Sequence, residues 1–179
     1  MQVQPVPKKG ILDAHLSDFI AARMARASAP QALCVALSGG RDSVVLLHAL
    51  NCLRLSSSFP FSLSALHVHH GISAQADAWA EFCAELCRAY EVPCSVVHVS
   101  APRDSGEGLE GAARRLRHAC FSRCAADCLM LAHHRDDQAE TVLLNLLRGA
   151  GVAGAAGMLA DRPQASGPVL LRPFLDLPR

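Results

Sequence analysis

The segment Ala36-Leu37-Ser38-Gly39-Gly40-Arg41-Asp42-Ser43 joins two apolar runs of different kinds. Residues 33–37 are continuously apolar, which is typical of a buried strand, and residues 44–47 begin a run whose apolar positions have helical spacing. A strand, a glycine turn and a helix start bring bare backbone N–H groups together, so they can surround an anion such as phosphate. The segment therefore predicts a phosphate-binding turn. A glycine-rich turn that binds no ligand is the alternative.

The glycine turn is not of the Walker type, because no Gly-Lys-Ser/Thr sequence follows its glycines. Its order, S-G-G-x-D-S, resembles the pyrophosphate-binding loop of the ATP pyrophosphatase superfamily. Enzymes of that superfamily split ATP between its α and β phosphates and use the adenylate to activate a substrate. So short a motif also occurs in unrelated turns, and its meaning depends on the rest of the chain.

Length and composition describe a single globular domain of 179 residues, 51% of them apolar, with a formal net charge of +1. Such a charge gives no general attraction for nucleic acid. The sequence lacks an apolar run long enough for a bilayer, and its polar, proline-bearing start does not look like a signal peptide. We therefore expect a cytoplasmic protein with no membrane partner. The eight cysteines contain no C-x-x-C pair and are interpreted as reduced, small buried residues rather than metal ligands.

Strand-like and helix-like segments alternate along the chain. Their order is helix 11–27, strand 32–37, helix 43–53, strand 63–68, helix 76–90, strand 95–99, helix 109–126, strand 128–132, helix 136–147 and strand 169–171. This alternation predicts an α/β fold of Rossmann-like type, an open parallel sheet of five strands with helices on both faces. We expect residues 1–30 to form an N-terminal tail and leading helix, and residues 31–179 to form the main domain.

Three polar corners follow predicted strands: Ser38–Ser43, His67–Gly71 and His133–Asp137. Parallel sheets bind their ligands outside the carboxyl ends of the strands, where these corners would meet. We therefore expect the functional site at that edge of the sheet.

The corner at His133 leads into a helix that begins with acidic residues. Helical geometry places the carboxylates of Asp137 and Glu140 on one face, one turn apart. Such a pair can hold a primary ammonium group or a divalent cation, and His133 could orient that group or move a proton. The alternative is that the acidic residues only cap the helix. A metal-hydrolase site made of His133, His134 and Asp137 is disfavoured, because adjacent residues on a strand point to opposite faces.

Two helix faces have a distinct chemistry. On the helix after His134, an apolar stripe is expected to face the core: Ala139, Val142, Leu143, Leu146 and Leu147. On helix 109–126, Arg114, Arg117 and His118 lie on one face. This cationic face is either a solvated, salt-bridged surface or a contact for phosphate or nucleic acid.

Five segments, in this order, resemble the N-terminal domain of the bacterial tRNA(Ile)-lysidine synthetases. They are Leu37-Ser38-Gly39-Gly40-Arg41-Asp42-Ser43, His67-Val68-His69-His70-Gly71-Ile72-Ser73, Glu110 to Arg117, Leu131-Ala132-His133-His134-Arg135-Asp136-Asp137-Gln138-Ala139-Glu140-Thr141, and Leu147-Arg148-Gly149-Ala150-Gly151. The resemblance extends over about residues 33–174. It implies an adenine-nucleotide hydrolase-like sandwich with a five-stranded parallel sheet, in which residues 31–179 are an ATP pyrophosphatase catalytic domain.

The resemblance implies a reaction in two steps. The C2 oxygen of the wobble cytidine in tRNA(Ile) attacks the α-phosphate of ATP, and pyrophosphate leaves. The ε-amine of free L-lysine then displaces AMP, which leaves lysidine in the tRNA. The implied ligands are therefore ATP, Mg²⁺, tRNA(Ile) with cytidine at the wobble position, and free lysine.

The resemblance also gives individual residues a role in binding the nucleotide. Backbone N–H groups of the glycine turn would hold the departing pyrophosphate: those of Ser38, Gly39, Gly40 and Ser43. Asp42 would bind or orient Mg²⁺, and the segment near His69 would line the nucleotide.

Further roles concern the substrates. Arg114, with Arg117, would steady phosphate charge or the cytidine. Asp137 and Glu140 would grip the amines of lysine, and His133 would lie beside the reacting centre. We expect Asp42, Arg114, His133 and Asp137 to be the residues that carry catalysis.

Two features depart from the family's pattern. His118 stands where the family usually has Tyr, and the chain ends at Arg179, where family members continue into domains that help bind tRNA. We therefore expect weak affinity for tRNA. Two alternatives stay open: a truncated nucleotide-binding module without turnover, and an ATP pyrophosphatase acting in tRNA thiolation, against which the lack of C-x-x-C cysteines argues. A homodimer is also left open.

Overall fold

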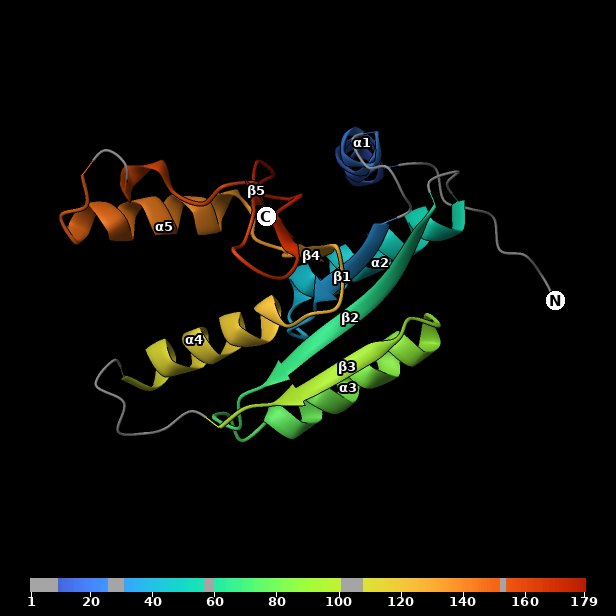
Figure 1. Ribbon diagram of the computed structural model, residues 1–179, viewed down its shortest axis with the longest axis horizontal. Helices are drawn as coiled ribbons and strands as arrows, with labels where there is room; N and C mark the ends of the chain where they lie inside the picture. Colours follow the sequence, from blue (N-terminus) through green and yellow to red (C-terminus); the bar gives the residue numbers. More distant parts are fainter. Residues whose placement is uncertain (1–9, 26–30, 57–59, 101–107, 152–153) are drawn as a thin grey trace.

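The computed structural model describes residues 10–25, 31–56, 60–100, 108–151 and 154–179 (Figure 1). Helices and strands alternate in the order α1 (Ile11–Met24), β1 (Gln31–Ala36), α2 (Arg41–Ser56), β2 (Phe61–His69), α3 (Ala76–Ala89), β3 (Cys94–His98), α4 (Gly108–Ser122), β4 (Cys128–Met130), α5 (Arg135–Leu147), the 3-10 helix η1 (Gly154–Ala156), β5 (Asp161–Arg162) and β6 (Val169–Leu171). The predicted α/β alternation is confirmed.

The strands form one sheet in the order β3-β2-β1-β4-β6-β5. The first five of these strands pair in parallel, and β5 adds an antiparallel edge to β6. The sheet thus has six strands rather than the predicted five; β5 has only two residues, both exposed, and no apolar run marks it in the sequence. The chain order reverses between β1 and β4. Their carboxyl ends therefore form the switch point at which sheets of this class bind ligands.

Side chains of the central strands alternate between two apolar layers. On one face, Leu33 and Val35 of β1 pack in a cluster with buried side chains of α1, α2 and α3. On the other face, Cys34 of β1 packs with Leu129 of β4 and Phe121 of α4. Burial on both faces explains why these strands are continuous apolar runs in the sequence. Helices cover both faces of the sheet, as predicted.

Helix α5 departs from its predicted packing. None of its described side chains is buried, and the exposed fractions of Leu143, Leu146 and Leu147 are 57%, 52% and 76%. Figure 1 shows α5 reaching outward from the sheet rather than lying flat on it. Its attachment is polar: the Gln138 side chain donates to the Met158 carbonyl oxygen and accepts from the Met158 N–H, at 2.9 and 2.7 Å. The prediction that the apolar stripe of α5 faces the core is therefore wrong.

Two further observations concern the cysteines and the membrane-spanning potential of the chain. All eight cysteines are free, and Cys34, Cys83, Cys87 and Cys128 are buried. Among the described helices, none combines the length and the apolar character needed to cross a membrane.

Candidate active site

The glycine turn links the end of β1 to the start of α2, as the sequence predicts. Gly39 has a φ of +86°, a conformation that favours glycine. A Cβ atom at this position would lie 2.8 Å from Cε3 of Trp79, which belongs to α3. Glycine is therefore required both by the backbone and by the indole ring that covers the turn.

Two serine hydroxyl groups hold the inside of the turn. The Ser43 hydroxyl donates to the Gly40 carbonyl oxygen at 2.9 Å and accepts from the Ser38 N–H at 3.2 Å. The Ser38 hydroxyl in turn accepts from the Gly40 N–H at 3.3 Å. An anion bound in the turn would take over these two N–H groups, whose present bonds are at the long end of the usual range.

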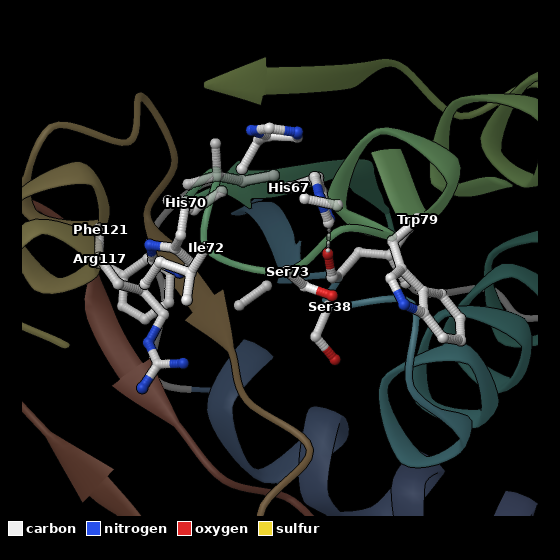
Figure 2. A pocket seen from close by; sticks show the side chains of 14 residues that line it. Ser38, His67, His70, Ile72, Ser73, Trp79, Arg117 and Phe121 are labelled. Atoms are coloured by element: carbon white, nitrogen blue, oxygen red, sulfur yellow. Dashed lines mark hydrogen bonds between the residues drawn. The ribbon is translucent and has the colours of Figure 1, made fainter. Parts of the chain in front are cut away.

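An apolar cavity of about 280 Å³ lies on one side of the turn, at the ends of β1 and β2. Figure 2 shows Arg117 and Phe121 of α4 on one side of this apolar cavity, Trp79 on the other, and Ser38 between them. In the floor, His67 Nδ1 lies 2.8 Å from the Leu37 carbonyl oxygen, so this nitrogen carries the proton and donates.

Two more histidines of β2 and its end line the apolar cavity. His69 Nε2 lies 2.8 Å from an Asp77 carboxylate oxygen, and its ring packs on that of His98. The Nδ1 atom of His70 is buried without a hydrogen-bond partner among the described residues. Burial, followed by the charge of Arg117, lowers the pKa of His70 below its ordinary value. His70 is therefore a neutral group in the wall.

A larger cavity of about 550 Å³, the arginine cavity, lies on the other side of the turn. Four arginines line it: Arg114, Arg117, Arg162 and Arg172. They come from α4, β5 and the residue after β6. Asp42 is the only carboxylate among the described residues in its lining. The balance of charge therefore favours an anionic ligand.

Two histidines in the arginine cavity have pKa values below the ordinary value, in part because of this positive charge. Burial, followed by the charge of Arg114, lowers the pKa of His118. Burial, followed by the charge of Arg172, lowers the pKa of His133 to about 4. Both imidazoles are neutral at pH 7, because burial and neighbouring cations disfavour their charged form.

The two cavities share a wall formed by Ala36, Ser38, Arg117 and Phe121. Seven predicted site residues line the arginine cavity: Ser38, Gly40, Asp42, Ser43, Arg114, Arg117 and His133. His69 lines the apolar cavity, and Gly39 lies beneath Trp79. Asp137 and Glu140 line neither cavity.

The adjacent histidines after β4 have separate partners. His133 Nδ1 accepts from Arg172 Nε at 3.2 Å. His134 is buried and caps the start of α5: its Nδ1 accepts from the Asp136 N–H, and its own N–H donates to the Asp137 carboxylate. His134 Nε2 lies 3.5 Å from Asp137 Oδ2 and 3.8 Å from Asp42 Oδ2. The two histidines therefore do not face one ion, and the part of the chain that the structure describes has no group of three metal-ligating side chains placed to hold one.

Sequence reasoning missed three residues of the site. Trp79 is the single Trp of the chain, but only the fold brings it over Gly39. Arg172 directly follows the predicted strand 169–171, so its place at a strand end was a usable signal. Arg162 lies on β5, the strand without a sequence signal.

A glycine turn at the switch point of a parallel sheet, between an apolar and a cationic cavity, is typical of nucleotide-binding α/β proteins. A family profile described as PP-loop domain matches residues 12–179. The chain therefore belongs to the PP-loop domain family.

Similar proteins support this assignment. The chain is 53% identical over 148 residues to a tRNA(Ile)-lysidine synthase of Alkalilimnicola ehrlichii, covering 82% of this chain and 33% of that protein. It is 52% identical over 157 residues to the tRNA(Ile)-lysidine synthase of Aromatoleum aromaticum, covering 87% and 36%. The resemblance predicted from the motifs is confirmed, and the chain spans about a third of the length of these relatives.

Among solved structures, the U34-tRNA thiolase NcsA from Methanococcus maripaludis with its 4Fe-4S cluster matches with a TM-score of 0.71. The match covers all of this chain and 70% of that one, at 19% identity. At that identity the likeness concerns the fold alone.

Proposed function

We propose that this chain carries the ATP-binding and adenylating site of a tRNA(Ile)-lysidine synthase. The observation that carries the proposal is the position of the glycine turn between an apolar cavity and an arginine cavity with a common wall. A nucleotide needs both surfaces, one for its base and one for its phosphates. The similarity to tRNA(Ile)-lysidine synthases supports this reaction over others that a PP-loop domain can carry.

The apolar cavity would take the adenine ring. Trp79 and Phe121 offer aromatic surface to a base, and such contacts are worth about 0.5–1.5 kcal/mol beyond the buried area. His69 would line the nucleotide close to its ribose, held in place by Asp77. ATP would therefore enter with its phosphates directed across Ser38 toward the arginine cavity.

The glycine turn would hold the pyrophosphate. N–H groups would come from its backbone, those of Ser38, Gly39, Gly40 and Ser43. Asp42, with a side chain that is 31% exposed at the cavity rim, is the carboxylate that would bind Mg²⁺, in exchange for its ion pair with Arg179 at 3.4 Å. One carboxylate fits this cation, because Mg²⁺ commonly binds one or two carboxylates together with substrate phosphates and waters. When bound there, Mg²⁺ would neutralise charge on the phosphate oxygens.

The adenylation step would take place in the arginine cavity. The C2 oxygen of the wobble cytidine forms a bond to the α-phosphorus, and the bond from this phosphorus to the pyrophosphate oxygen breaks. Arg114 and Arg117 would stabilise the negative charge that is shared by the phosphate oxygens in this step. His133 would lie beside the same phosphate.

The lysine step would use the start of α5. Asp137 and Glu140 would grip the amines of free lysine, since two carboxylates one turn apart suit a cationic amino acid. Asp137 lies outside the arginine cavity, next to His134, which separates it from Asp42. The neutral ε-amine then forms a bond to C2 of the cytidine and releases one proton to water, while the bond from C2 to the adenylate oxygen breaks and AMP leaves with that oxygen.

The test measures the two half-reactions separately. We expect the chain, mixed with ATP, Mg²⁺ and an anticodon stem-loop of tRNA(Ile), to release pyrophosphate without lysine and AMP only with lysine. Asp137→Asn should abolish the lysine-dependent release of AMP but retain pyrophosphate release, because Asn still accepts the capping hydrogen bond of His134. Asp136→Asn, a change at the exposed neighbour, is the matched control.

Each outcome has a defined meaning. Equal AMP release by Asp137→Asn and the wild type would show that Asp137 does not bind lysine. ATP binding without any pyrophosphate release would indicate a nucleotide-binding module without turnover. No ATP binding in a calorimetric titration at millimolar concentration would overturn the proposed function.

A further inference from the structure

Arg172 is a buried cation in the wall of the arginine cavity. It follows β6 directly, and only 5% of the residue is exposed. Its Nη1 donates to the Leu159 carbonyl oxygen at 2.6 Å, and its Nε donates to His133 Nδ1 at 3.2 Å. None of the ion pairs among the described residues includes Arg172. Burying a guanidinium without a carboxylate is costly, so this arrangement calls for a function.

The bond from Arg172 fixes the proton on His133. A guanidinium has only N–H donors, so the imidazole nitrogen that faces it must accept. A neutral imidazole has one protonated nitrogen, and with Nδ1 accepting, the proton is on Nε2. Protonation of both nitrogens would set two N–H groups against each other. The lowered pKa of His133, about 4, agrees with this neutral form.

We propose that Arg172 is a positioning residue that holds His133 as its Nε2–H tautomer, so that His133 acts as a hydrogen-bond donor in the arginine cavity and not as a base. The inference deepens the proposed function and rests on it for the identity of the acceptor, a non-bridging oxygen of the α-phosphate. Arg114, Arg117 and Arg162 line the same cavity, so an anionic oxygen is the acceptor that its charge favours. His133 therefore transfers no proton during either step.

The tautomer is measured directly by NMR on the 179-residue chain with ¹⁵N-labelled histidine, with His133 assigned from the missing signals of His133→Gln. Near neutral pH we expect an unprotonated, pyridine-like shift for Nδ1 and a protonated, pyrrole-like shift for Nε2. Arg172→Met should abolish this preference, and both tautomers should appear. The matched control is Arg162→Met, which removes one exposed arginine of the same cavity and should leave the His133 shifts in place.

Three results would overturn the proposal. They are a protonated Nδ1 in the wild type, an unchanged tautomer in Arg172→Met, or an equal effect of the two arginine variants. The wild-type spectrum alone shows which nitrogen of His133 carries the proton, even if Arg172→Met does not fold. It also requires no activity, so a wrong tautomer and a wrong proposed function give different results.

A second measurement separates a donor from a base. His133→Gln keeps an N–H donor but cannot take up a proton, whereas His133→Ala has neither group. We expect pyrophosphate release by His133→Gln to stay within about tenfold of the wild type. For His133→Ala we expect a loss of about a hundredfold, the usual effect of removing one donor to a developing negative charge. Equal losses in the two variants would assign His133 as a base and contradict the proposal.

Discussion

The apolar cavity and the arginine cavity meet at Ser38 but offer a ligand opposite surfaces. One is lined by Trp79, Ile72 and three histidines, the other by four arginines against a single aspartate among the described lining residues. The first can bury a flat ring, and the second can neutralise phosphate. Neither surface by itself would orient a nucleotide.

The difference arises from the switch point of the sheet. The apolar cavity lies at β1 and β2, and α3, which follows β2, brings Ala76 and Trp79 to it. The arginine cavity lies toward β4 and β6, where α4, β5 and the residue after β6 supply its arginines. One glycine turn therefore serves two environments, and each can be changed separately.

The largest effect is expected from Gly39→Ala, which disturbs both cavities at once. The methyl group would force an alanine into a left-handed conformation and push Trp79 out of the apolar cavity. Backbone strain alone costs about 1–3 kcal/mol. With the displaced ring added, we expect ATP affinity to fall by roughly a hundredfold in a calorimetric titration.

Gly149→Ala is the control for strain alone. Gly149 also has a positive φ, 76°, but nothing lies within 4 Å of a Cβ atom there. This variant should have a lower free energy of unfolding but the same affinity for ATP as the wild type. Equal losses of ATP affinity in both variants would contradict a specific role of Gly39.

The pH dependence of stability should show how strongly the arginine cavity disfavours a positive charge on His133. Because the pKa of His133 is about 4 in the folded state and near 6.5 in the unfolded chain, the unfolded chain binds more protons between these values. Stability should therefore fall as the pH falls through this window, by about 3 kcal/mol in total, with no further loss from this group below it. Urea unfolding of His133→Gln across the same window should lack this part of the slope. A surface control, His48→Gln, should keep it.

Arg114→Ala should weaken the binding of phosphate groups without changing the binding of the base. Arg114 lines only the arginine cavity, and a hydrogen bond to a charged group is worth about 1.5–3 kcal/mol. We expect pyrophosphate to bind about tenfold more weakly and adenosine to bind as in the wild type. Weaker binding of adenosine would mean that the two cavities are not independent.

Trp79→Leu is the complementary change and has a smaller expected effect. The Trp79 side chain is exposed to 43% and touches only the apolar cavity, so replacing its aromatic surface should cost about 1 kcal/mol of base binding. Adenosine should bind about fivefold more weakly, and pyrophosphate should be unaffected. Weaker binding of pyrophosphate with unchanged binding of adenosine would mean that the two cavities have the opposite roles.

The parts that sequence predicted well depend on local patterns. The run of residues 33–37 and the glycines after it determine a strand and a turn without help from distant residues. Corners at strand ends could be assigned to one edge, because parallel topology leaves little choice. His133 and His134 do have separate partners, but β4 ends at Met130 and neither histidine lies on a strand, so alternation along a strand is not the reason.

The parts that it missed depend on partners far along the chain. The bond between His133 and Arg172 exists because β4 pairs with β6, which aligns Met130 with Leu171. Nothing near His133 in the sequence announces that partner. The prediction that the apolar stripe of α5 faces the core was wrong for a related reason. Periodicity shows that a helix has an apolar face, but not that the fold supplies a surface to cover that face.

The exposed leucines of α5 give the smallest expected effect. Thr141 and Asn145 of this helix line the arginine cavity, while Leu147 is 76% exposed on another part of its surface. Leu147→Ser should therefore change the free energy of unfolding by less than about 0.5 kcal/mol, as is usual for exposed positions, and leave pyrophosphate binding unchanged. Leu129→Ala, a fully buried change in β4, should cost about 2–5 kcal/mol in the same urea titration.

A large loss in Leu147→Ser would contradict the exposure of this face in solution. If that loss also grew with protein concentration, a second copy of the chain would be the surface that covers α5, because association makes stability depend on concentration. The homodimer left open by the sequence would then have its interface on the outer wall of the arginine cavity. A small loss at all concentrations would leave α5 attached through polar contacts such as those of Gln138 with Met158 and of the Arg135 N–H with the Leu177 carbonyl oxygen.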